Sequence, residues 1–494
     1  SEAYAYDADG NRRPLLKRET PYPGKCVMHK PWIGETLPVY VWDRYEEFDD
    51  VRPMIELDDA TIENYLQRNV TIVERVVREY GIKALHANHA VLMSVVAERV
   101  SRKTGIPFAI MPHGSAIEYA VKKDKRFFNY ALQAFDAAAI IFVIGQEIRQ
   151  RVIDLFPQIQ HVHRKMVTLN LGVDTSLFRL LPPEEKPVSV GKLMQVLPVN
   201  SQGKSEAQAQ NLFNGLKDDL TLDEMLRLIE ENHEYDGKQP DQNAAEKLQT
   251  IRWGKEPVVL FVGRIIASKG LHLILAALPL VLKNHPNLRM VVVGHGPLRE
   301  PLEAFVRALE SGNLHLVRNI VRWGLRLEGG PAKPFEEIAL FFNRLERDGQ
   351  LNNYFHRAQQ YLRSERIVFT GYLRHKELRY LFPACDVAVF PSIVAEAGPL
   401  VFLEALACGC FPIGTYFAGM AASIDSLQGA IPDPVREIMK LSVEKDKVVS
   451  EIADKIGRAL EVDDDIRGAL RRVAVEKYDW QNISKKYLRA FSSV

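Results

Sequence analysis

The chain has 494 residues, 47% of them hydrophobic, and its 64 basic side chains almost balance 63 acidic ones. This length suits two or three domains with sizeable apolar cores. The near-neutral balance excludes a dedicated nucleic-acid binder, which carries a clear basic excess. The four cysteines form no disulfide framework, so we expect a reducing, cytoplasmic compartment.

We expect neither a secretory signal nor a membrane span. The first residues are polar, unlike a signal peptide. Residues 405–424 carry no charge over about the length of a transmembrane helix. Gly409, Pro412, Gly414 and Gly419 interrupt this stretch, which therefore predicts a helix end, a buried strand and a loop inside a core.

Strands and helices are predicted to alternate through the first third of the chain, after 37 residues without a convincing periodic element. Apolar runs of strand length lie at 37–42, 83–88, 107–112, 137–144 and 166–171. Helical spacing occupies 59–80, 90–104 and 146–156. This alternation predicts an α/β domain with a parallel, doubly wound sheet, which we assign to residues 1–178.

Residues 180–255 break this rhythm. They contain the pair Pro182-Pro183, many polar residues and one predicted helix, 222–232. We interpret 179–255 as a linker or an insertion between two domains.

The strand–helix pattern resumes in the second half of the chain. Strands are predicted at 257–262, 288–293, 366–370 and 386–392. Helices are predicted at 271–284 and 375–382, with a longer helical region around 301–363. We assign 256–448 to a second α/β domain and 449–494 to C-terminal helices that pack back toward the first domain.

Two glutamates flank the start of an apolar helix. Proline is favoured at the first helical position, so a helix is predicted over 399–409, with Glu396 before it and Glu404 inside it. The first free amides, at Leu400 and Val401, would suit a phosphate or a sugar oxygen. The alternative is structural: Glu404 pairs with an arginine at the edge of the core, and Glu396 is an ordinary loop carboxylate.

Three other side chains follow predicted strands. Arg264 and Lys269 lie on a loop with glycines on both flanks, where two cations can clamp a diphosphate, although surface charge on such a loop is an equal alternative. His113 follows a strand and precedes a glycine, but a lone histidine is more often structural than catalytic.

Neither a metal site nor a membrane contact is the favoured interpretation of the remaining charged stretches. The aspartate-rich stretches show no D-x-D after an apolar strand, so we expect no metal ligands. Residues 122–128 mix cations with aromatics, which favours a solvated helix start; contact with an acceptor or a membrane surface is the alternative.

Several motifs together resemble a known family. VLFVGRIIASKGLHLILAALPLV, VVVGHGPL, RIVFTGYLRHKELRYLFPACDVAVFPS and EAGPLVFLEALACG resemble the C-terminal half of retaining GT-B glycosyltransferases of the glycogen-synthase-like superfamily, nearest to GT4. MPHGS and NLGVDTSLF resemble the matching N-terminal half. The resemblance covers most of 83–178 and 256–425, and it implies two Rossmann-like, doubly wound domains facing across a cleft.

The resemblance also implies roles for individual residues. The implied catalytic residues are His113, which faces the reacting sugar, and Arg264, Lys269 and Glu396. The implied donor-binding residues are Gly263, Arg264 and Lys269 at the diphosphate, Glu396 and the amides of Gly398, Leu400 and Val401 at sugar and phosphate, Glu404 at the ribose, and Leu373 along the base.

The chain departs from the family pattern in two places. Gly398 and Pro399 stand where an aromatic residue and a glycine are common, so one backbone donor is lost. No glycine-rich acceptor loop can be recognised in residues 1–50.

The resemblance implies metal-independent transfer of a sugar, with retention, from a nucleotide-diphosphate sugar to an acceptor hydroxyl. UDP-glucose is the default donor, and no cofactor is expected. The acceptor would be a sugar, a lipid-linked group or a small molecule, and the protein would be cytoplasmic, with peripheral membrane contact as an option. The alternatives are a non-catalytic sugar-nucleotide binder or partner subunit, and a phosphorylase-type enzyme.

Overall fold

The computed structural model describes residues 1–17, 25–40, 48–394 and 400–492. The chain folds into two compact units, one formed by residues 1–170 with 484–494 and the other by 171–483. Each unit is built around an apolar core of its own.

Unit 1 contains a four-stranded parallel sheet in the order β6-β7-β8-β9. Its strands are β6 (Leu85–Asn88), β7 (Phe108–Met111), β8 (Ile140–Val143) and β9 (Met166–Thr168). The strands are short apolar runs, and all of β8 is buried, as expected where helices cover both faces of a parallel sheet. The connecting helices are α1 (Asp59–Tyr80), α2 (Met93–Thr104), α3 (Gly114–Ala116), α4 (Lys125–Ala137) and α5 (Gly145–Leu155).

The first 53 residues contain more structure than the sequence predicted. β1 (Glu2–Tyr6) lies between β2 (Arg12–Lys17) and β3 (Val27–Lys30), and β4 (Thr36–Val39) pairs with β5 (Asp50–Pro53). The expectation of no element before residue 37 was wrong. Every residue of β2 is exposed, so this strand lacks the alternation of buried and exposed residues that makes a strand recognisable.

The basic stretch 122–128 forms the start of a capped helix. The Asp124 side chain accepts a hydrogen bond from the Arg126 amide at 2.8 Å, and the Arg126 guanidinium pairs with Asp124 and Asp59. Phe127 is fully buried in the core of unit 1. These contacts are those of a stabilised helix start.

Unit 2 contains a six-stranded parallel sheet in the order β12-β11-β10-β13-β14-β15. Its strands are β10 (Val258–Val262), β11 (Arg289–Val293), β12 (Ile367–Gly371), β13 (Val387–Phe390), β14 (Phe411–Thr415) and β15 (Lys440–Leu441). From β10 the chain builds outward to β12 and then returns to β13 on the other side of β10. The strand order therefore reverses between β10 and β13, and at such a switch point the strand ends leave a crevice for a ligand.

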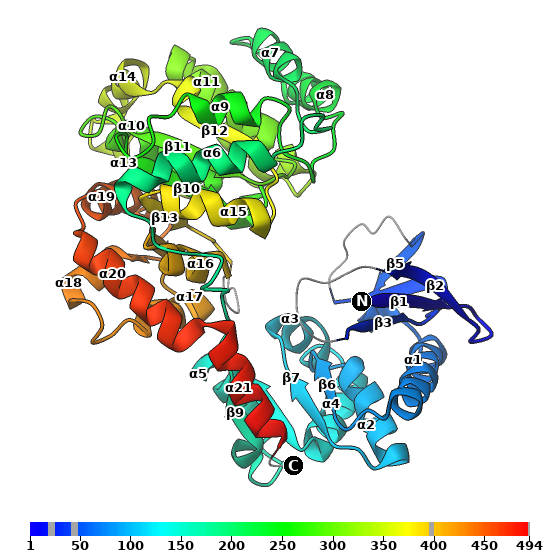
Figure 1. Ribbon diagram of the computed structural model, residues 1–494. Coiled ribbons are helices and arrows are strands. Elements are labelled where there is room, and N and C mark those ends of the chain that lie inside the picture. Colours follow the sequence, from blue (N-terminus) through cyan, green and yellow to red (C-terminus); the bar gives the residue numbers. More distant parts are fainter. Residues whose placement is uncertain (18–24, 41–47, 395–399, 493–494) are drawn as a thin grey trace. The chain divides into compact units, whose positions relative to one another are not determined.

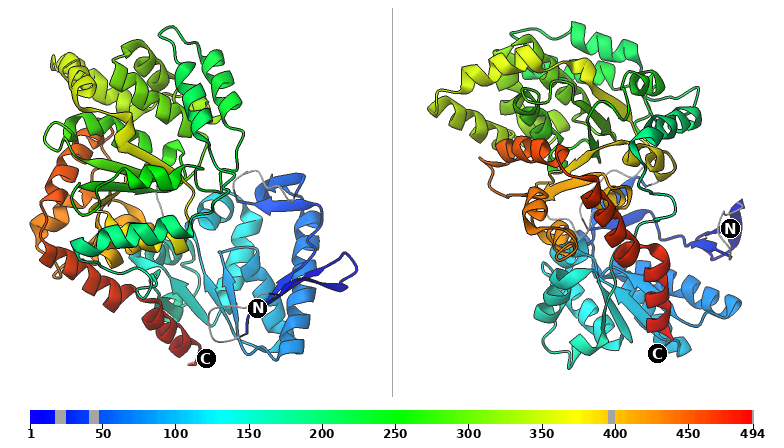
Figure 2. Two further views of the ribbon diagram at one scale, coloured as in Figure 1. Left: turned by 45° about the horizontal axis from the view of Figure 1, so that its top comes forward. Right: turned by 60° about the vertical axis from the view of Figure 1, so that its left-hand side comes forward.

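Helices lie on both sides of this sheet, as Figure 2 shows. They are α10 (Leu271–Val281), α11 (Arg299–Ser311), α12 (Leu314–Trp323), α13 (Glu336–Arg347), α14 (Leu351–Tyr361), α15 (His375–Leu381), α16 (Leu400–Cys408), α17 (Ala418–Asp425), α18 (Asp433–Ile438), α19 (Val448–Leu460) and α20 (Asp464–Val473). The long helical region predicted around 301–363 consists of α11 to α14 (Figure 1). The uncharged stretch 405–424 contains the end of α16, the buried strand β14 and most of α17.

The segment 179–255, which was predicted to be a linker or an insertion, belongs to unit 2. It contains α6 (Lys186–Val196), α7 (Glu206–Asn214), α8 (Leu222–Asn232) and α9 (Ala244–Gln249), of which only α8 was predicted. The Asp241 amide donates to the Thr370 carbonyl at the edge strand β12, and the Tyr372 amide donates to Gln239. The chain thus crosses between the units after residue 170, and 179–255 covers the edge of the sheet.

Buried ion pairs attach this segment to α11. Asp241 contacts Arg299 through two hydrogen bonds of 2.6 Å, and both side chains are almost completely buried. Lys204 is paired with Glu300 at 2.9 Å and also contacts Glu303. Burial opposes ionisation of Asp241, but Arg299 holds the pKa of this carboxyl below its usual value. A few of the polar residues in this segment, Lys204 and Asp241 among them, are therefore buried and neutralised by charges of α11.

The last helix, α21 (Trp480–Phe491), contributes its final residues to unit 1. The Tyr487 ring stacks on Phe142 of β8 at 4.9 Å, and its hydroxyl lies 2.6 Å from Nδ1 of His86. α19 and α20 belong to unit 2, so only the end of the predicted C-terminal helical segment joins the first unit.

We predict that Asp241→Ala lowers the free energy of unfolding by about 3 kcal/mol or more, because it leaves the buried Arg299 charge without its main partner. Urea titration followed by circular dichroism would measure this change. The control is Arg318→Ala, which removes an exposed pair with Glu346 and should change the free energy by less than about 1 kcal/mol. Equal effects of the two substitutions would contradict the role of the buried pair.

Candidate functional site

The loops after β10 and β11 approach each other so closely that glycine is required. The Gly263 amide donates to the Val293 carbonyl, and the Ile265 amide donates to the His295 carbonyl at 2.8 Å. Gly294 has φ of +144°, and a Cβ atom there would lie 1.8 Å from the Gly263 carbonyl oxygen. The loop carrying Arg264 is therefore fixed at the carboxyl end of β10.

The same loop also contacts the segment after β13. The Ile393 amide donates to the Ser268 carbonyl at 2.9 Å, and the Ser392 hydroxyl donates to the same oxygen at 3.0 Å. Gly270 has φ of +74°, and a Cβ atom there would lie 2.0 Å from the Pro391 carbonyl oxygen. Lys269 immediately precedes this contact, so its backbone is held at the switch point of the sheet.

Arg264 is exposed at this edge of the sheet and acts electrostatically on two neighbours. Burial, and then the charge of Arg264, lower the pKa of His295. Burial raises the pKa of Glu328, while a hydrogen bond from the Ala267 amide at 3.0 Å and the charge of Arg264 oppose that rise. Glu328 was not predicted; its carboxylate anchors the turn that carries Lys269.

The helix predicted over 399–409 is α16, which is described from Leu400 onward. Glu396, Gly398 and Pro399 lie outside the described residues. Gly409 follows α16 with φ of +65°, the left-handed conformation that ends many helices. Leu400 and Val401 form the first turn of α16, which follows the segment joined to the Lys269 loop.

Glu404 projects from α16 and is only 4% exposed. Its Oε1 lies 2.7 Å from Nδ1 of His375, the first residue of α15. Its Oε2 is buried and has no hydrogen-bond partner among the described residues. A buried acceptor without a partner is costly, so this oxygen is suited to a hydroxyl donor from a ligand. The structural alternative named arginine as the partner of Glu404, whereas the partner is a histidine that the sequence analysis missed.

The loop after β12 presents an aromatic side chain near this edge. Leu373, which was expected along the base, is 3% exposed and packs in the core. Tyr372 is exposed, and its ring meets that of His295 edge-on at 5.7 Å. Among the described side chains of this loop, Tyr372 rather than Leu373 offers a ring face to a base.

In unit 1, His113 belongs to a cluster at the carboxyl ends of β6 and β7. Its Nε2 lies 3.4 Å from Oδ1 of Asn88, and its ring is 4.6 Å from the ring of His89. His89 has φ of +70°, a strained conformation for a side chain of this size. Burial lowers the pKa of His113, and burial together with His113 lowers the pKa of His89 to about 4, so both rings are neutral at pH 7.

The structure therefore brings most of the described donor-binding candidates to one edge of the unit 2 sheet. Gly263, Arg264 and Lys269 follow β10, while Leu400, Val401 and Glu404 belong to the helix after β13. His113 lies at the corresponding edge of the unit 1 sheet, with His89 as a neighbour that the lone-histidine interpretation did not include. His89 contacts His113, and His375 contacts Glu404. Neither histidine belongs to a sequence motif from which these contacts could be predicted.

Within residues 1–17, 25–40, 48–394 and 400–492, no group of three or more histidine, cysteine, aspartate or glutamate side chains is placed to hold a metal ion. In the same ranges, every helix is too short or too polar to cross a membrane.

Part of unit 2 matches a known protein family. Residues 244–319 and 348–459 match the family described as Glycosyl transferases group 1. This match confirms the resemblance carried by the motifs, and the parallel sheets of the two α/β units agree with the GT-B fold class that the motifs implied.

Similar proteins include an uncharacterized glycosyltransferase, MJ1607, of Methanocaldococcus jannaschii, 23% identical over 48% of this chain and 45% of the relative. A glycogen synthase of Mycobacterium tuberculosis is 24% identical over 46% of this chain and 40% of the relative. The chain thus spans less than half the length of these two curated relatives. Among solved structures, Alr3699/HepE of Anabaena in complex with UDP has a TM-score of 0.48 and 16% identity, covering 86% of this chain and 82% of that one.

We predict that the His375–Glu404 pair makes stability depend on pH. The hydrogen bond to Glu404 raises the pKa of His375 above its ordinary value of 6.5. The stabilisation is complete below pH 6.5 and is lost as pH rises through the higher pKa of the folded state. Thermal unfolding of wild type and His375→Gln between pH 5.5 and 8.5 should show a difference that shrinks with increasing pH. A difference that grows with pH would contradict the pair.

Proposed function

We propose that this chain, whose unit 2 carries the glycosyl transferases group 1 match, transfers a sugar from a nucleotide-diphosphate sugar to an acceptor hydroxyl with retention at the anomeric carbon. The observation that carries the proposal is Oε2 of Glu404 on α16, which is buried and has no hydrogen-bond partner among the described residues. A donor nucleotide bound here would supply the missing hydrogen bond through a ribose hydroxyl.

Negative charge develops on the diphosphate as it leaves the sugar. The site would lower the activation free energy mainly by stabilising this charge. Arg264 and Lys269 supply two positive charges after β10, and the first amides of α16 supply the positive end of a helix dipole. The backbone that carries Arg264 and Lys269 is held by the close contacts of the loops before the reaction, which limits the reorganisation needed as charge appears. We propose that the protein neutralises the diphosphate in this way without a bound metal ion.

His375 would act as a positioning residue for the nucleotide. It holds Oε1 of Glu404 and leaves Oε2 directed to a ribose hydroxyl. The rings of Tyr372 and His295 pack edge-on at the same edge of the sheet, and a base could stack on the exposed Tyr372 ring. UDP-glucose is the donor that we propose to test first.

His113 and His89 would serve the reacting sugar and its acceptor. Because both imidazoles are neutral at pH 7, each can donate one hydrogen bond and accept another without adding charge. Nδ1 of His89 is buried and has no partner among the described residues, which leaves it for a sugar hydroxyl. The acceptor class that fits is a sugar, a lipid-linked group or a small molecule bearing such a hydroxyl.

We predict that Lys269→Ala lowers kcat/KM for the donor at least about tenfold, since removal of one preorganised donor typically costs about 3 kcal/mol. Steady-state release of the nucleoside diphosphate would measure this. The matched control is Lys283→Ala, an exposed lysine beyond the end of α10, which should leave kcat/KM unchanged. Unchanged kinetics for Lys269→Ala, with an unchanged melting temperature, would contradict a role of Lys269 in binding the diphosphate.

We also predict that transfer continues in excess EDTA, because the cations and helix amides neutralise the diphosphate. The assay compares initial rates with and without EDTA at saturating donor. Complete loss of activity that magnesium restores would contradict the metal-independent mechanism.

A non-catalytic sugar-nucleotide binder would give a different result. Calorimetry with UDP-, GDP- and ADP-sugars would identify the donor, and each donor that binds would then be assayed for hydrolysis and for transfer to glycoside acceptors. Binding without turnover on any acceptor would favour the binder or partner subunit over the enzyme.

A further inference from the structure

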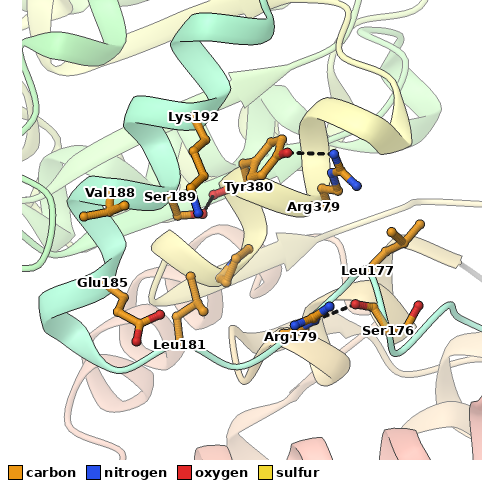
Figure 3. A pocket seen from close by; sticks show the side chains of 11 residues that line it. Ser176, Leu177, Arg179, Leu181, Glu185, Val188, Ser189, Lys192, Arg379 and Tyr380 are labelled. Carbon is orange, nitrogen blue, oxygen red and sulfur yellow. Dashed lines mark hydrogen bonds between the residues drawn. The ribbon is translucent and has the colours of Figure 1, made fainter.

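A second pocket of unit 2, about 350 Å³ in volume, lies apart from the loops after β10 and β13. It is lined by α6, by the end of α15 and by the segment 176–181 that precedes α6 in the chain. Figure 3 shows Lys192 on α6, Arg379 on α15 and Arg179 on the segment. The motifs and the proposed donor site leave all three side chains without a role.

The lining of this pocket is positively charged. Arg179, Lys192 and Arg379 contribute three cations, whereas Glu185 contributes a single carboxylate. Within the part of the chain that the structure describes, none of the three cations forms an ion pair with a carboxylate.

The two arginines are held in place by neutral groups. Nη2 of Arg379 donates to the Tyr380 hydroxyl at 2.6 Å, and its guanidinium carbon lies 4.6 Å from the centre of the Tyr380 ring. Nε of Arg379 is buried and lacks a hydrogen-bond partner among the described residues. Arg179 donates from Nε to the Ser176 carbonyl at 2.5 Å, which leaves its terminal nitrogens for a ligand. Two oriented arginines and a lysine suit the oxygens and the double charge of a phosphate group.

The pocket also has an apolar part that would accommodate more than an inorganic ion. Leu177, Leu181, Val188 and Pro383 line it beside the cations. We propose that this pocket binds a phosphorylated small molecule, with the phosphate on Arg179, Lys192 and Arg379 and the carbon skeleton against the apolar side chains.

Two of the elements that line the pocket, α15 and the segment 176–181, are connected to Glu404 through His375 and α16. His375 and Arg379 are four residues apart on α15, so they lie on the same face of that helix. Phe178, next to Arg179, meets the His375 ring edge-on at 6.3 Å. The Arg471 guanidinium donates to the carbonyls of Phe178 and Ala407, which ties the segment to α16. A phosphate drawn onto Arg179 and Arg379 therefore acts on the two elements that hold His375 beside Glu404, and we infer that the ligand is an effector of the donor site.

Calorimetry tests binding with inorganic phosphate, glycerol 3-phosphate and uncharged glycerol as probes. We expect both phosphates to bind, the ester at least threefold more tightly because of its carbon skeleton, and glycerol not to bind. The double variant Arg179→Gln/Lys192→Gln, which changes two exposed side chains, should weaken phosphate binding at least tenfold. The matched control Lys283→Gln/Lys376→Gln removes the same charge outside the pocket and should bind as wild type does.

Lys269→Ala separates this pocket from the proposed diphosphate site. Phosphate binding that persists in Lys269→Ala and is lost in Arg179→Gln/Lys192→Gln would support the proposal. Absence of binding at 10 mM phosphate, or binding that depends on Lys269 and not on Arg179 and Lys192, would overturn it. The measurement detects binding directly, so its outcome is independent of whether the protein transfers a sugar.

The NMR signal of the His375 imidazole, assigned with His375→Gln, tests the effector role. Saturating glycerol 3-phosphate should shift this signal in the wild type and leave it unchanged in Arg179→Gln/Lys192→Gln. An unshifted His375 signal in the phosphate-bound wild type would overturn the effector role.

Discussion

The contact between the loops after β10 and β13 is the constraint on which the rest of unit 2 depends. These strands are neighbours because the strand order reverses there, and Gly270 lets the two loops meet without a side chain between them. The contact holds the backbone of Lys269 near the segment that enters α16. Positive side chains, helix amides and the buried Glu404 are therefore collected at one edge by sheet topology rather than by closeness in sequence.

Glu404 shows how burial prepares a polar group for a ligand. One oxygen is bound by His375, and the other is buried with no described partner, which is unfavourable until a donor arrives. The same principle distinguishes Arg299 from Arg379. Arg299 is paired with Asp241 and Glu303 and holds the 179–255 segment on the sheet edge. Arg379 keeps a buried Nε that no described residue contacts through a hydrogen bond, in a pocket with excess positive charge.

The proposed sites differ in how the protein treats charge. At the unit 2 edge, Arg264 is exposed and lies on the same loop as Lys269, so positive charge is concentrated there. In the cluster around His113 and His89, burial keeps the imidazoles neutral, which suits hydrogen bonds to hydroxyls more than binding of phosphate. A strained φ at His89 is the kind of local cost that a fold tolerates where a side chain must be held in one direction.

The sequence by itself indicated the alternation of strands and helices in 83–171 and 256–415, because short apolar runs between turn residues, alternating with stretches of helical spacing, are typical of a parallel α/β sheet. It also singled out Arg264 and Lys269, which follow a strand, and Glu404, which lies inside a helix, as candidates from local pattern. It missed β1 to β3, the helices α6, α7 and α9 of 179–255, and the contacts of His375 and His89. Their roles depend on partners distant in the chain: an edge strand without alternation is stabilised by its neighbour, and the charges of Lys204 and Asp241 are buried only because α11 supplies opposite charges. Only the tertiary structure could decide these features, because burial and pairing are properties of the packed chain and not of any local stretch of it.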